Sequence, residues 1–259
     1  MGRKWSMKVS ILGMLVNVIT SEEVVGRVSS WMERGNREGT YICVSNVHMV
    51  METFDNETFR SIVNEANLVL PDSRILAWAQ KSLGEKDAQQ VYGPDIMVAL
   101  CKRAAEDRLR IGLYGGTVES LDKIQRNLRQ KFPQLHFSYV FSPPFRPLTP
   151  EEDSTVVKEI RSSGTQMLFV GLGCPKQEIW MAEHNDRVNA VMLGVGAAFD
   201  FIAGTKKNPP TWIRSIGLGW LFRLLSEPRR LWKRYLKQNP RFVWHFSRQF
   251  FRQKLGKTT

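Results

Sequence analysis

The amino-acid sequence predicts an α/β protein with a mainly parallel sheet. Between Tyr41 and Gly194, short apolar runs alternate with segments of helical periodicity, and this order is typical of strands joined by crossover helices. Residues 167–170 are apolar throughout, as expected of a strand that is covered on both faces. A chain of 259 residues with 42% hydrophobic residues suits one large domain, or one domain with an appendage.

The first 83 residues contain four apolar runs and three helical patterns. Gly13 separates two short runs near the start, and Gly35, Asn36 and Gly39 close the first helical pattern. We expect strands at residues 9–12, 14–18, 41–44 and 68–70, and helices at residues 21–34, 56–67 and 74–83.

Strand and helix signals follow one another more regularly in the second part of the chain. Thr149 precedes Pro150 and two acidic residues, a combination typical of a helix start. Pro175 fits the first position of another helix, where the missing N–H is not needed. We expect strands at residues 110–114, 136–141, 167–170 and 190–194, and helices at residues 94–105, around 121–128, from 149 and from 175 to 185.

The positive charge of the chain is concentrated at its C-terminal end. The net charge is +12. Residues 205–259 contain fourteen Lys or Arg and one acid, Glu227, which leaves twenty-three basic and twenty-four acidic residues before them. Composition changes at residues 204–210. We therefore predict a Rossmann-like sheet with helices on both faces in residues 1–204, and a basic helical appendage in residues 205–259.

The charge asymmetry indicates a polyanionic partner for the appendage, either nucleic acid or an anionic membrane surface. Helices are expected to start at Glu227-Pro228 and again at Asn239-Pro240, and four of the eight tryptophans lie in the appendage. Basic helices with interleaved aromatic residues suit the headgroup layer of a membrane. No nucleic-acid motif is recognisable, so we favour the membrane. No apolar run reaches the roughly 18–20 residues that a spanning helix needs.

Cysteine and histidine spacing gives no sign of a metal site. Cys43, Cys101 and Cys174 lie far apart and form no CxxC pair, and the four histidines are scattered. This pattern argues against a disulfide framework or a zinc site and fits a reducing cytoplasm. The sequence also lacks an Asp-x-Asp pair, so a metal clamp for a diphosphate is not indicated. We expect neither a metal nor a cofactor.

Residues 167–180 combine a strand, a glycine turn and a helix start, an arrangement that favours a bound anion and above all a phosphate. Gly171 and Gly173 form the turn, and Lys176 and Gln177 place a cation and an amide at the same edge. A dinucleotide-dependent oxidoreductase is disfavoured, since Lys176 stands where the third glycine belongs and no strand-end acid follows at the required distance. A purely structural turn remains the alternative.

Two further glycine turns, at Gly93 and at Gly115-Gly116, suit a transferase that binds the diphosphate of a nucleotide-activated donor. Polar residues also follow two strands, where open α/β sheets place their ligands: Ser45 and Asn46 after one, and Asp72 after the other. Asp72 is a candidate general base for an acceptor hydroxyl. Its alternative role is to cap the helix that starts near Ser73.

Seven motifs occur in order between Tyr41 and Phe242. They are SNVHMV (45–50), PD (71–72), YGPD (92–95, which includes Asp95), SPPF (142–145), VGLGCPKQE (170–178), GVGAAFD (194–200) and WLFRLLSEPRR (220–230). In these motifs the chain resembles the WecG/TagA/CpsF glycosyltransferases of bacterial cell-surface polymers.

The resemblance implies an inverting, metal-independent hexosyltransferase. Such enzymes move a sugar, often of the N-acetylmannosamine type, from a UDP donor to an undecaprenyl-diphosphate-linked sugar during exopolysaccharide or teichoic acid synthesis. It implies that Asp72 is the base, that Asn46 and Gln177 lie in the active-site pocket, and that Arg223 and Arg230 belong to an appendage that closes the site and touches the membrane. We therefore expect a peripheral protein on the cytoplasmic face of the cell membrane.

Three positions depart from the family pattern. Val44 replaces a common Thr, Ser73 replaces the usual Gly, and Gly219 replaces a frequent Glu. The departures leave the fold unaffected and the sugar specificity open. The sequence also leaves open the acceptor sugar and the oligomeric state, a homo-oligomer included. Two other functions remain as alternatives: a UDP-sugar sensor without turnover, and nucleic-acid binding through the appendage.

Overall fold

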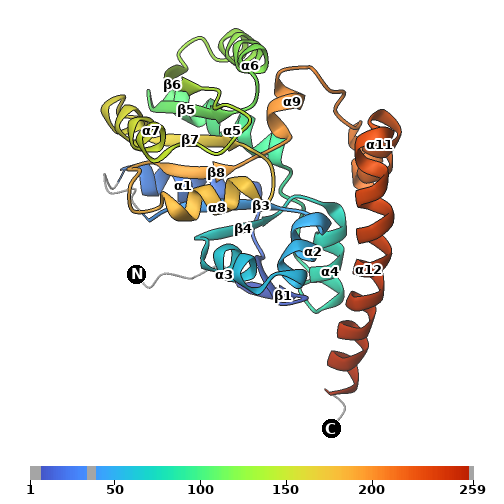
Figure 1. Ribbon diagram of the computed structural model, residues 1–259. Helices are drawn as coiled ribbons and strands as arrows, with labels where there is room; N and C mark the ends of the chain where they lie inside the picture. Colours follow the sequence, from blue (N-terminus) through green and yellow to red (C-terminus); the bar gives the residue numbers. More distant parts are fainter. Residues whose placement is uncertain (1–6, 34–38, 257–259) are drawn as a thin grey trace. The chain divides into compact units, whose positions relative to one another are not determined.

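The computed structural model describes residues 7–33 and 39–256 (Figure 1). The strands of its main sheet are β3 (Tyr41–Ser45), β4 (Leu68–Pro71), β5 (Arg110–Gly115), β6 (His136–Phe141), β7 (Met167–Gly171) and β8 (Val191–Gly194). They lie in the order β4-β3-β8-β7-β5-β6. The pairings of β3 with β8, β8 with β7, β7 with β5 and β5 with β6 are parallel, which confirms the predicted fold class.

Helices connect these strands. They are α1 (Ser21–Glu33), α2 (Val47–Asp55), α3 (Glu57–Glu65), α4 (Arg74–Ser82), α5 (Gly93–Glu106), α6 (Val118–Lys131), α7 (Pro150–Ser162), α8 (Lys176–Glu183) and α9 (Ala198–Ile202). The C-terminal part of the chain forms α10 (Thr211–Ser215), α11 (Gly219–Ser226) and α12 (Pro228–Leu255). The expected cap of α7 is present, because the Thr149 hydroxyl accepts a hydrogen bond from the N–H of Glu152.

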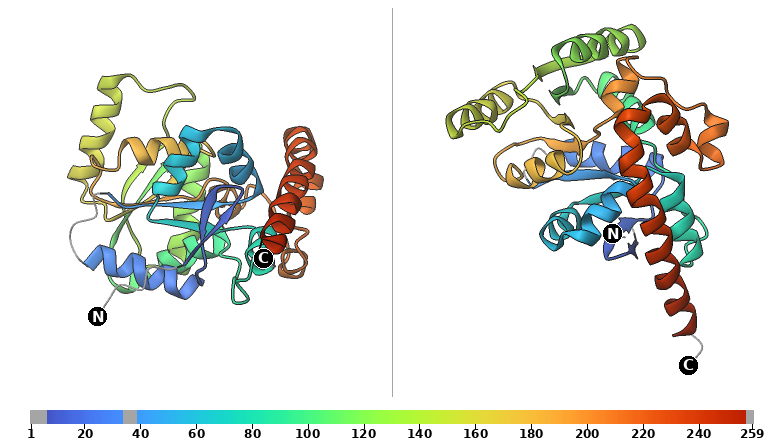
Figure 2. Two further views of the ribbon diagram at one scale, coloured as in Figure 1. Left: turned by 90° about the horizontal axis from the view of Figure 1, so that it is seen from below. Right: turned by 45° about the vertical axis from the view of Figure 1, so that its right-hand side comes forward.

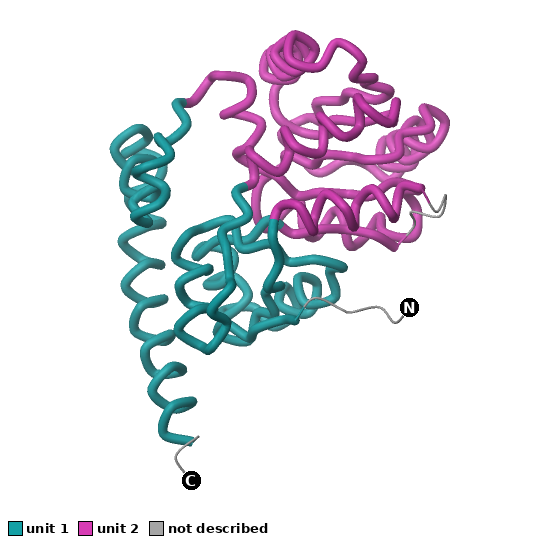
Figure 3. Tube along the Cα trace, turned by 180° about the vertical axis from the view of Figure 1, so that it is seen from behind, with its two compact units in different colours: residues 1–20, 44–92, 207–259 teal, residues 21–43, 93–206 magenta. Residues whose placement is uncertain are grey.

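The chain divides into two compact units (Figure 3). The first consists of residues 1–20, 44–92 and 207–259, and the second of residues 21–43 and 93–206. The boundary falls inside β3, between Cys43 and Val44. Compactness thus groups the appendage with earlier segments of the chain. The functional division at residue 204 stays a prediction.

The core of the second unit is the buried part of the parallel sheet. Leu168, Phe169 and Val170 of β7 and Leu193 of β8 have no exposed surface, as the apolar runs predict. Helices α1 and α8 both contact β8 and lie on opposite faces of the sheet (Figure 2). Because these strands run parallel, their carboxyl ends, and the turns that follow them, lie along one edge.

The first unit is held together by a hairpin and buried amide side chains. Strands β1 (Lys8–Ile11) and β2 (Met14–Asn17) pair antiparallel, and Gly13 takes a positive φ of 90° in the turn between them. Asn17, 2% exposed, accepts a 2.7 Å hydrogen bond from the N–H of Val69. The Gln80 amide donates to the carbonyl oxygen of Asn17 at 3.0 Å, so the hairpin is fastened to β4 and α4.

Helix α12 is attached to α2 by polar contacts along its length. The His48 Nδ1 lies 2.7 Å from the Gln238 amide oxygen, and the Gln238 amide donates to Glu52 at 2.9 Å. Further along, Arg241 makes two hydrogen bonds to the Asp55 carboxylate, at 2.9 and 2.6 Å. The hydrogen bond from Arg241 holds the pKa of Asp55 below its usual value. The appendage is therefore part of a packed unit.

Several local predictions were wrong or incomplete. Pro240 was expected to start a new helix, but α12 continues through it (Figure 2), since packing on α2 outweighs the one backbone hydrogen bond that proline removes. Pro175 precedes α8 as its N-cap rather than forming its first residue, and the Cys174–Pro175 peptide is cis. Helices α2 and α9 were not predicted. The predicted helix end at Gly35 and Asn36 lies outside the described residues.

Close contact between the β5 and β7 turns gives a stability prediction. A Cβ atom at Gly115 would lie 2.7 Å from the backbone of Gly171, and Gly115 has a φ of +110°. We expect Gly115→Ala to lower the free energy of unfolding by about 1–3 kcal/mol more than Gly204→Ala, because overpacking adds to the conformational strain. Gly204 lies in the same unit with a φ of +72° and no atom within 4 Å of the added Cβ. Equal losses in urea denaturation would contradict the steric explanation.

Candidate functional site

Ser45, Asn46 and Asp72 lie together at the ends of β3 and β4. The Asp72 N–H donates a 2.8 Å hydrogen bond to the carbonyl oxygen of Ser45. Ser45 is fully buried, and its hydroxyl donates to the sulfur of Met14 at 3.6 Å. The Asn46 side chain caps α2 by accepting hydrogen bonds from the N–H groups of His48 and Met49, at 3.0 and 3.3 Å. Both polar side chains thus have structural partners in this structure.

The backbone of Asp72 is fixed on two sides. Its N–H bonds to Ser45, and its carbonyl oxygen accepts a 2.6 Å hydrogen bond from the Gln90 amide. The cap of α4 is Ser73, whose hydroxyl accepts from the N–H of Leu76 at 3.3 Å. The alternative role of Asp72 as the helix cap is therefore wrong. Ser73, one of the departures from the family pattern, does that work.

The beginning of the appendage is fastened next to this group. The Arg74 guanidinium donates to the carbonyl oxygen of Ser215 at 3.2 Å. The Tyr92 hydroxyl donates to Asn208 at 2.7 Å, and the Arg214 guanidinium lies 4.3 Å from the centre of the Tyr92 ring. These contacts join residues 208–215 to the helix that follows Asp72 and to the end of the next loop.

Arg223 and Arg230, the two arginines of the resemblance, both reach Glu227. The Arg230 guanidinium lies 2.6 Å from one carboxylate oxygen of Glu227, and the Arg223 guanidinium lies 3.9 Å from the other. The three residues occupy the corner where α11 ends and α12 begins. Sequence reasoning did not single out Glu227 as a site residue, although its isolation among fourteen basic residues was visible.

In the second unit, three of the predicted glycines are closely packed. Gly116 and Gly171 lie against the ring of Phe199, and Gly115 lies against the backbone of Gly171. A Cβ at Gly171 would lie 2.5 Å from the Phe199 ring, and one at Gly116 would lie 3.3 Å from it. The Ser142 hydroxyl also donates to the carbonyl oxygen of Gly116 at 2.7 Å. These glycines are thus required by close packing, whatever they bind. Phe199 stood in a quoted motif, but nothing in the pattern marked it as the ring that fills this space.

The turn at Gly173 is built differently. Gly173 has a φ of +80° and open space around the position of a Cβ. Its N–H donates to the Gln177 side-chain oxygen at 3.1 Å, and the Gln177 N–H donates back to the Gly173 carbonyl at 2.9 Å. The Gln177 amide also lies close to two other glycines: a Cβ atom added at Gly194 would lie 3.0 Å from it, and one added at Gly196 would lie 3.3 Å from it. Gln177 therefore stabilises this turn through two hydrogen bonds, and its side chain is buried, at 3% exposure.

Glu178 lies directly behind Gln177 and is fully buried. Its carboxylate accepts a 2.7 Å hydrogen bond from the Gln177 amide, which fixes the orientation of that amide. Burial raises the pKa of Glu178 to about 7, although the hydrogen bonds from Gln177, the backbone and the Cys174 thiol act in the opposite direction. A buried, readily protonated carboxyl at the glycine turn was missed because its burial depends on tertiary packing.

The other predicted residues of the second unit lie at helix starts. Lys176 is the first residue of α8 and is exposed. Gly93 is buried at the start of α5, and Asp95 is exposed in the first turn of that helix. The predicted residues are divided between the two units: Ser45, Asn46, Asp72, Arg223 and Arg230 belong to the first, and the glycine turns, Asp95, Lys176 and Gln177 belong to the second.

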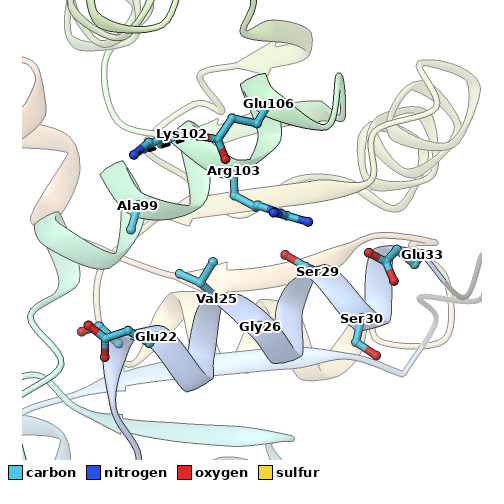
Figure 4. A pocket seen from close by; sticks show the side chains of 11 residues that line it. Glu22, Val25, Gly26, Ser29, Ser30, Glu33, Ala99, Lys102, Arg103 and Glu106 are labelled. Atoms are coloured by element: carbon cyan, nitrogen blue, oxygen red, sulfur yellow. Dashed lines mark ion pairs between the residues drawn. The ribbon is translucent and has the colours of Figure 1, made fainter.

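A separate hollow of about 610 Å³ lies between α1 and α5 (Figure 4). Small residues form its floor on α1, including Gly26 and Ser29, and an ion pair of 3.9 Å between Lys102 and Glu106 lies on its α5 side. None of the predicted site residues lines this hollow, so we assign it no part in the chemistry.

The buried carboxyl gives a pH-dependent prediction. The folded-state pKa of Glu178, about 7, lies above its ordinary value of 4.5, so its contribution to stability is lost as the pH rises from about 4.5 to 7. Glutamine does not ionise. We therefore compare the free energy of unfolding of Glu178→Gln with that of the unmodified protein at pH 5 and at pH 8. The difference should shift in favour of the variant by about 2–3 kcal/mol as the pH rises, because only the unmodified protein loses this stabilisation.

Urea denaturation at the two pH values measures this difference. Glu183→Gln, which changes an exposed glutamate on the same helix, is the matched control and should show no such gain. An equal effect of Glu178→Gln at both pH values would contradict the buried, protonated carboxyl.

No helix in the described parts of the chain combines the length and apolarity needed to cross a bilayer. A family model described as "Glycosyl transferase WecG/TagA/CpsF family" matches residues 9–256. The chain is 27% identical over 247 residues to the N-acetylglucosaminyldiphosphoundecaprenol N-acetyl-beta-D-mannosaminyltransferases of Staphylococcus aureus strains MW2 and NCTC 8325. These alignments cover 95% of this chain and 94% of each relative. The protein therefore belongs to the WecG/TagA/CpsF family of glycosyltransferases.

Proposed function

We propose that this protein moves a hexose of the N-acetylmannosamine type from a UDP donor to a sugar linked to undecaprenyl diphosphate. The observation that carries the proposal is family membership over residues 9–256, together with relatives named for such a transfer. The product belongs to the synthesis of a cell-surface polysaccharide of the exopolysaccharide or teichoic acid kind. The reaction takes place at the cytoplasmic face of the membrane, where a lipid-linked acceptor is available.

We assign the role of general base to Asp72. Its carboxylate takes the proton of the acceptor hydroxyl while the hydroxyl oxygen forms a bond to the anomeric carbon of the donor sugar. The bond from that carbon to the diphosphate breaks in the same displacement, so the configuration is inverted and UDP leaves. The hydrogen bonds from Asp72 N–H to Ser45 and from Gln90 to the Asp72 carbonyl support this role, because they hold the base in one position.

The negative charge that develops on the departing UDP is, in this proposal, stabilised by Lys176, Arg223, Arg230 and the backbone N–H groups of the glycine turns. Cationic side chains and backbone N–H groups that face a developing negative charge stabilise the transition state. No Asp-x-Asp pair occurs in the sequence, which favours a metal-independent reaction. Gln177 and Asn46 are then substrate-binding residues whose present hydrogen bonds set their orientation.

The base assignment predicts the effect of Asp72→Asn. We expect the rate of sugar transfer to fall at least about 100-fold, since the amide cannot accept the proton, while UDP binding stays near normal. Release of UDP from UDP-N-acetylmannosamine in the presence of a lipid-diphosphate acceptor measures the reaction. Asp87→Asn, a change of an exposed aspartate in the same unit, should retain activity. Near-normal transfer by Asp72→Asn would exclude it as the base.

The same assay separates the enzyme from a sensor. A protein that only binds the UDP-sugar would release no UDP when the acceptor is added, whatever residue stands at position 72.

We also propose that the appendage binds an anionic membrane surface. Ten of the fourteen exposed large hydrophobic side chains in the described parts of the chain lie beyond residue 205. Those on α12 occupy one side of the helix at 3.6 residues per turn, opposite the buried Leu231 and Phe242. They are Trp232, Leu236, Val243, Trp244, Phe251 and Leu255. Basic residues between them would add about 1 kcal/mol each near an anionic leaflet.

Membrane binding is tested on the full chain with vesicles that contain phosphatidylglycerol. Trp232 and Trp244 are 46% and 63% exposed. We expect replacement of both by Ser to weaken binding about tenfold or more, because two large apolar groups lose their burial in the lipid. Phe145→Ser, at a 94% exposed residue outside the appendage, should not change binding, and added salt should weaken it. Tight binding of duplex DNA without vesicle binding would favour the nucleic-acid alternative.

A further inference from the structure

The appendage contains a single acid, and that acid has an unusual position. Among residues 205–259, Glu227 is the one carboxylate beside fourteen basic residues. It lies at the corner between α11 and α12. Its N–H donates to the carbonyl oxygen of Arg223 at 2.9 Å, and its own carbonyl accepts from the N–H of Leu231 at 3.1 Å. These two hydrogen bonds fix the backbone of Glu227 and thus the point from which its side chain extends.

The Glu227 carboxylate pairs with arginines and makes no capping hydrogen bond to α12. Glu227 is the N-cap residue of α12, but its side chain makes no capping hydrogen bond. One of its oxygens lies 2.6 Å from Arg230 and the other 3.9 Å from Arg223. A capping hydrogen bond thus does not account for this side chain, although its charge also lies at the positive end of the α12 dipole.

The two ion pairs differ in exposure and in length. The Glu227 and Arg223 side chains are 18% and 19% exposed, and that of Arg230 is 53% exposed. The Arg230 pair is partly exposed, where ion pairs are weak, and the Arg223 pair is long, at 3.9 Å. A diphosphate offers several anionic oxygens that suit the fork of donors on a guanidinium. Two guanidinium groups gathered around one carboxylate are therefore preorganised for a stronger anion.

We propose that Glu227 is the internal counter-ion of Arg223 and Arg230: it keeps the two guanidinium groups together until the diphosphate of the nucleotide displaces it. Glu227 is a positioning residue in this reaction. The inference rests on the proposed function, in which the two arginines bind the departing UDP. It adds that the empty protein carries an anion in the place that the diphosphate takes.

The test is Glu227→Gln in the full chain, with UDP as the probe and calorimetry as the measurement. The amide keeps the size of the side chain but removes the competing charge. We expect the Kd for UDP to fall at least about fivefold, and its dependence on salt to become steeper, because the arginines then carry one more uncompensated charge. Loss of a merely structural residue would weaken binding, so a gain in affinity distinguishes the two roles. Unchanged or weaker binding by a folded variant would overturn the inference.

The chain offers a matched control. Glu57 and Arg60 form a pair with the same i, i+3 spacing on α3, in which the Glu57 side chain is 84% exposed against 18% for Glu227. Glu57→Gln removes an equivalent carboxylate far from the appendage in sequence, and it should leave the Kd for UDP unchanged. A gain as large as that of Glu227→Gln would show a general charge effect and would overturn the inference.

Two arginine variants separate this inference from the proposed function. Arg223→Ala and Arg230→Ala should each raise the Kd for UDP. If both bind UDP as the unmodified protein does, the arginines do not hold the nucleotide, and the inference falls together with that part of the proposed function. If both weaken binding while Glu227→Gln has no effect, the proposed role of the arginines stands and the counter-ion is overturned alone.

Discussion

Parallel strand pairing is the constraint on which the rest of this structure depends. Because β3, β8, β7, β5 and β6 pair in parallel, the turns after these strands fall along one edge of the sheet. The chain must reverse there at short range, and glycine permits the backbones to approach. At Gly115 and Gly171 the approach leaves no room for a Cβ. Parallel pairing, which buries the core of the sheet, therefore also produces the turns for which we propose diphosphate binding.

The two units use their polar side chains in different ways. In the second unit, the buried Glu178 accepts a hydrogen bond from the Gln177 amide, and Gln177 in turn accepts one from the N–H of Gly173, which sets the shape of this turn. In the first unit, polar contacts of α12 with α2 tie the basic appendage to the helix that follows β3. A strongly basic segment thus has defined partners within its own unit. Its exposed aromatic side is the surface for which we propose membrane binding, and Glu227 pairs with the two arginines that we assign to the nucleotide.

Much of the fold was predictable because its signals are local. Thr149 and Pro150 start α7 as expected, and the apolar runs around residues 167–170 and 190–194 are buried strands. Predictions failed where packing outweighed a local rule. Pro240 did not end its helix, because one lost hydrogen bond is small beside the contacts of α12 with α2. Helix α2 was missed because Asn46, whose side chain caps it, was interpreted as a binding residue and not as a helix start.

The sequence by itself determined the α/β class, the basic appendage, the family resemblance and the list of polar strand ends. These follow from composition, periodicity and motif order, which need no knowledge of distant contacts. Only the tertiary structure decided that Ser73 rather than Asp72 caps α4, that Phe199 fills the space beside Gly116 and Gly171, and that Glu227 pairs with two arginines. Each of these depends on side-chain packing and on the choice between competing hydrogen-bond partners, and that choice is made only when the chain is folded.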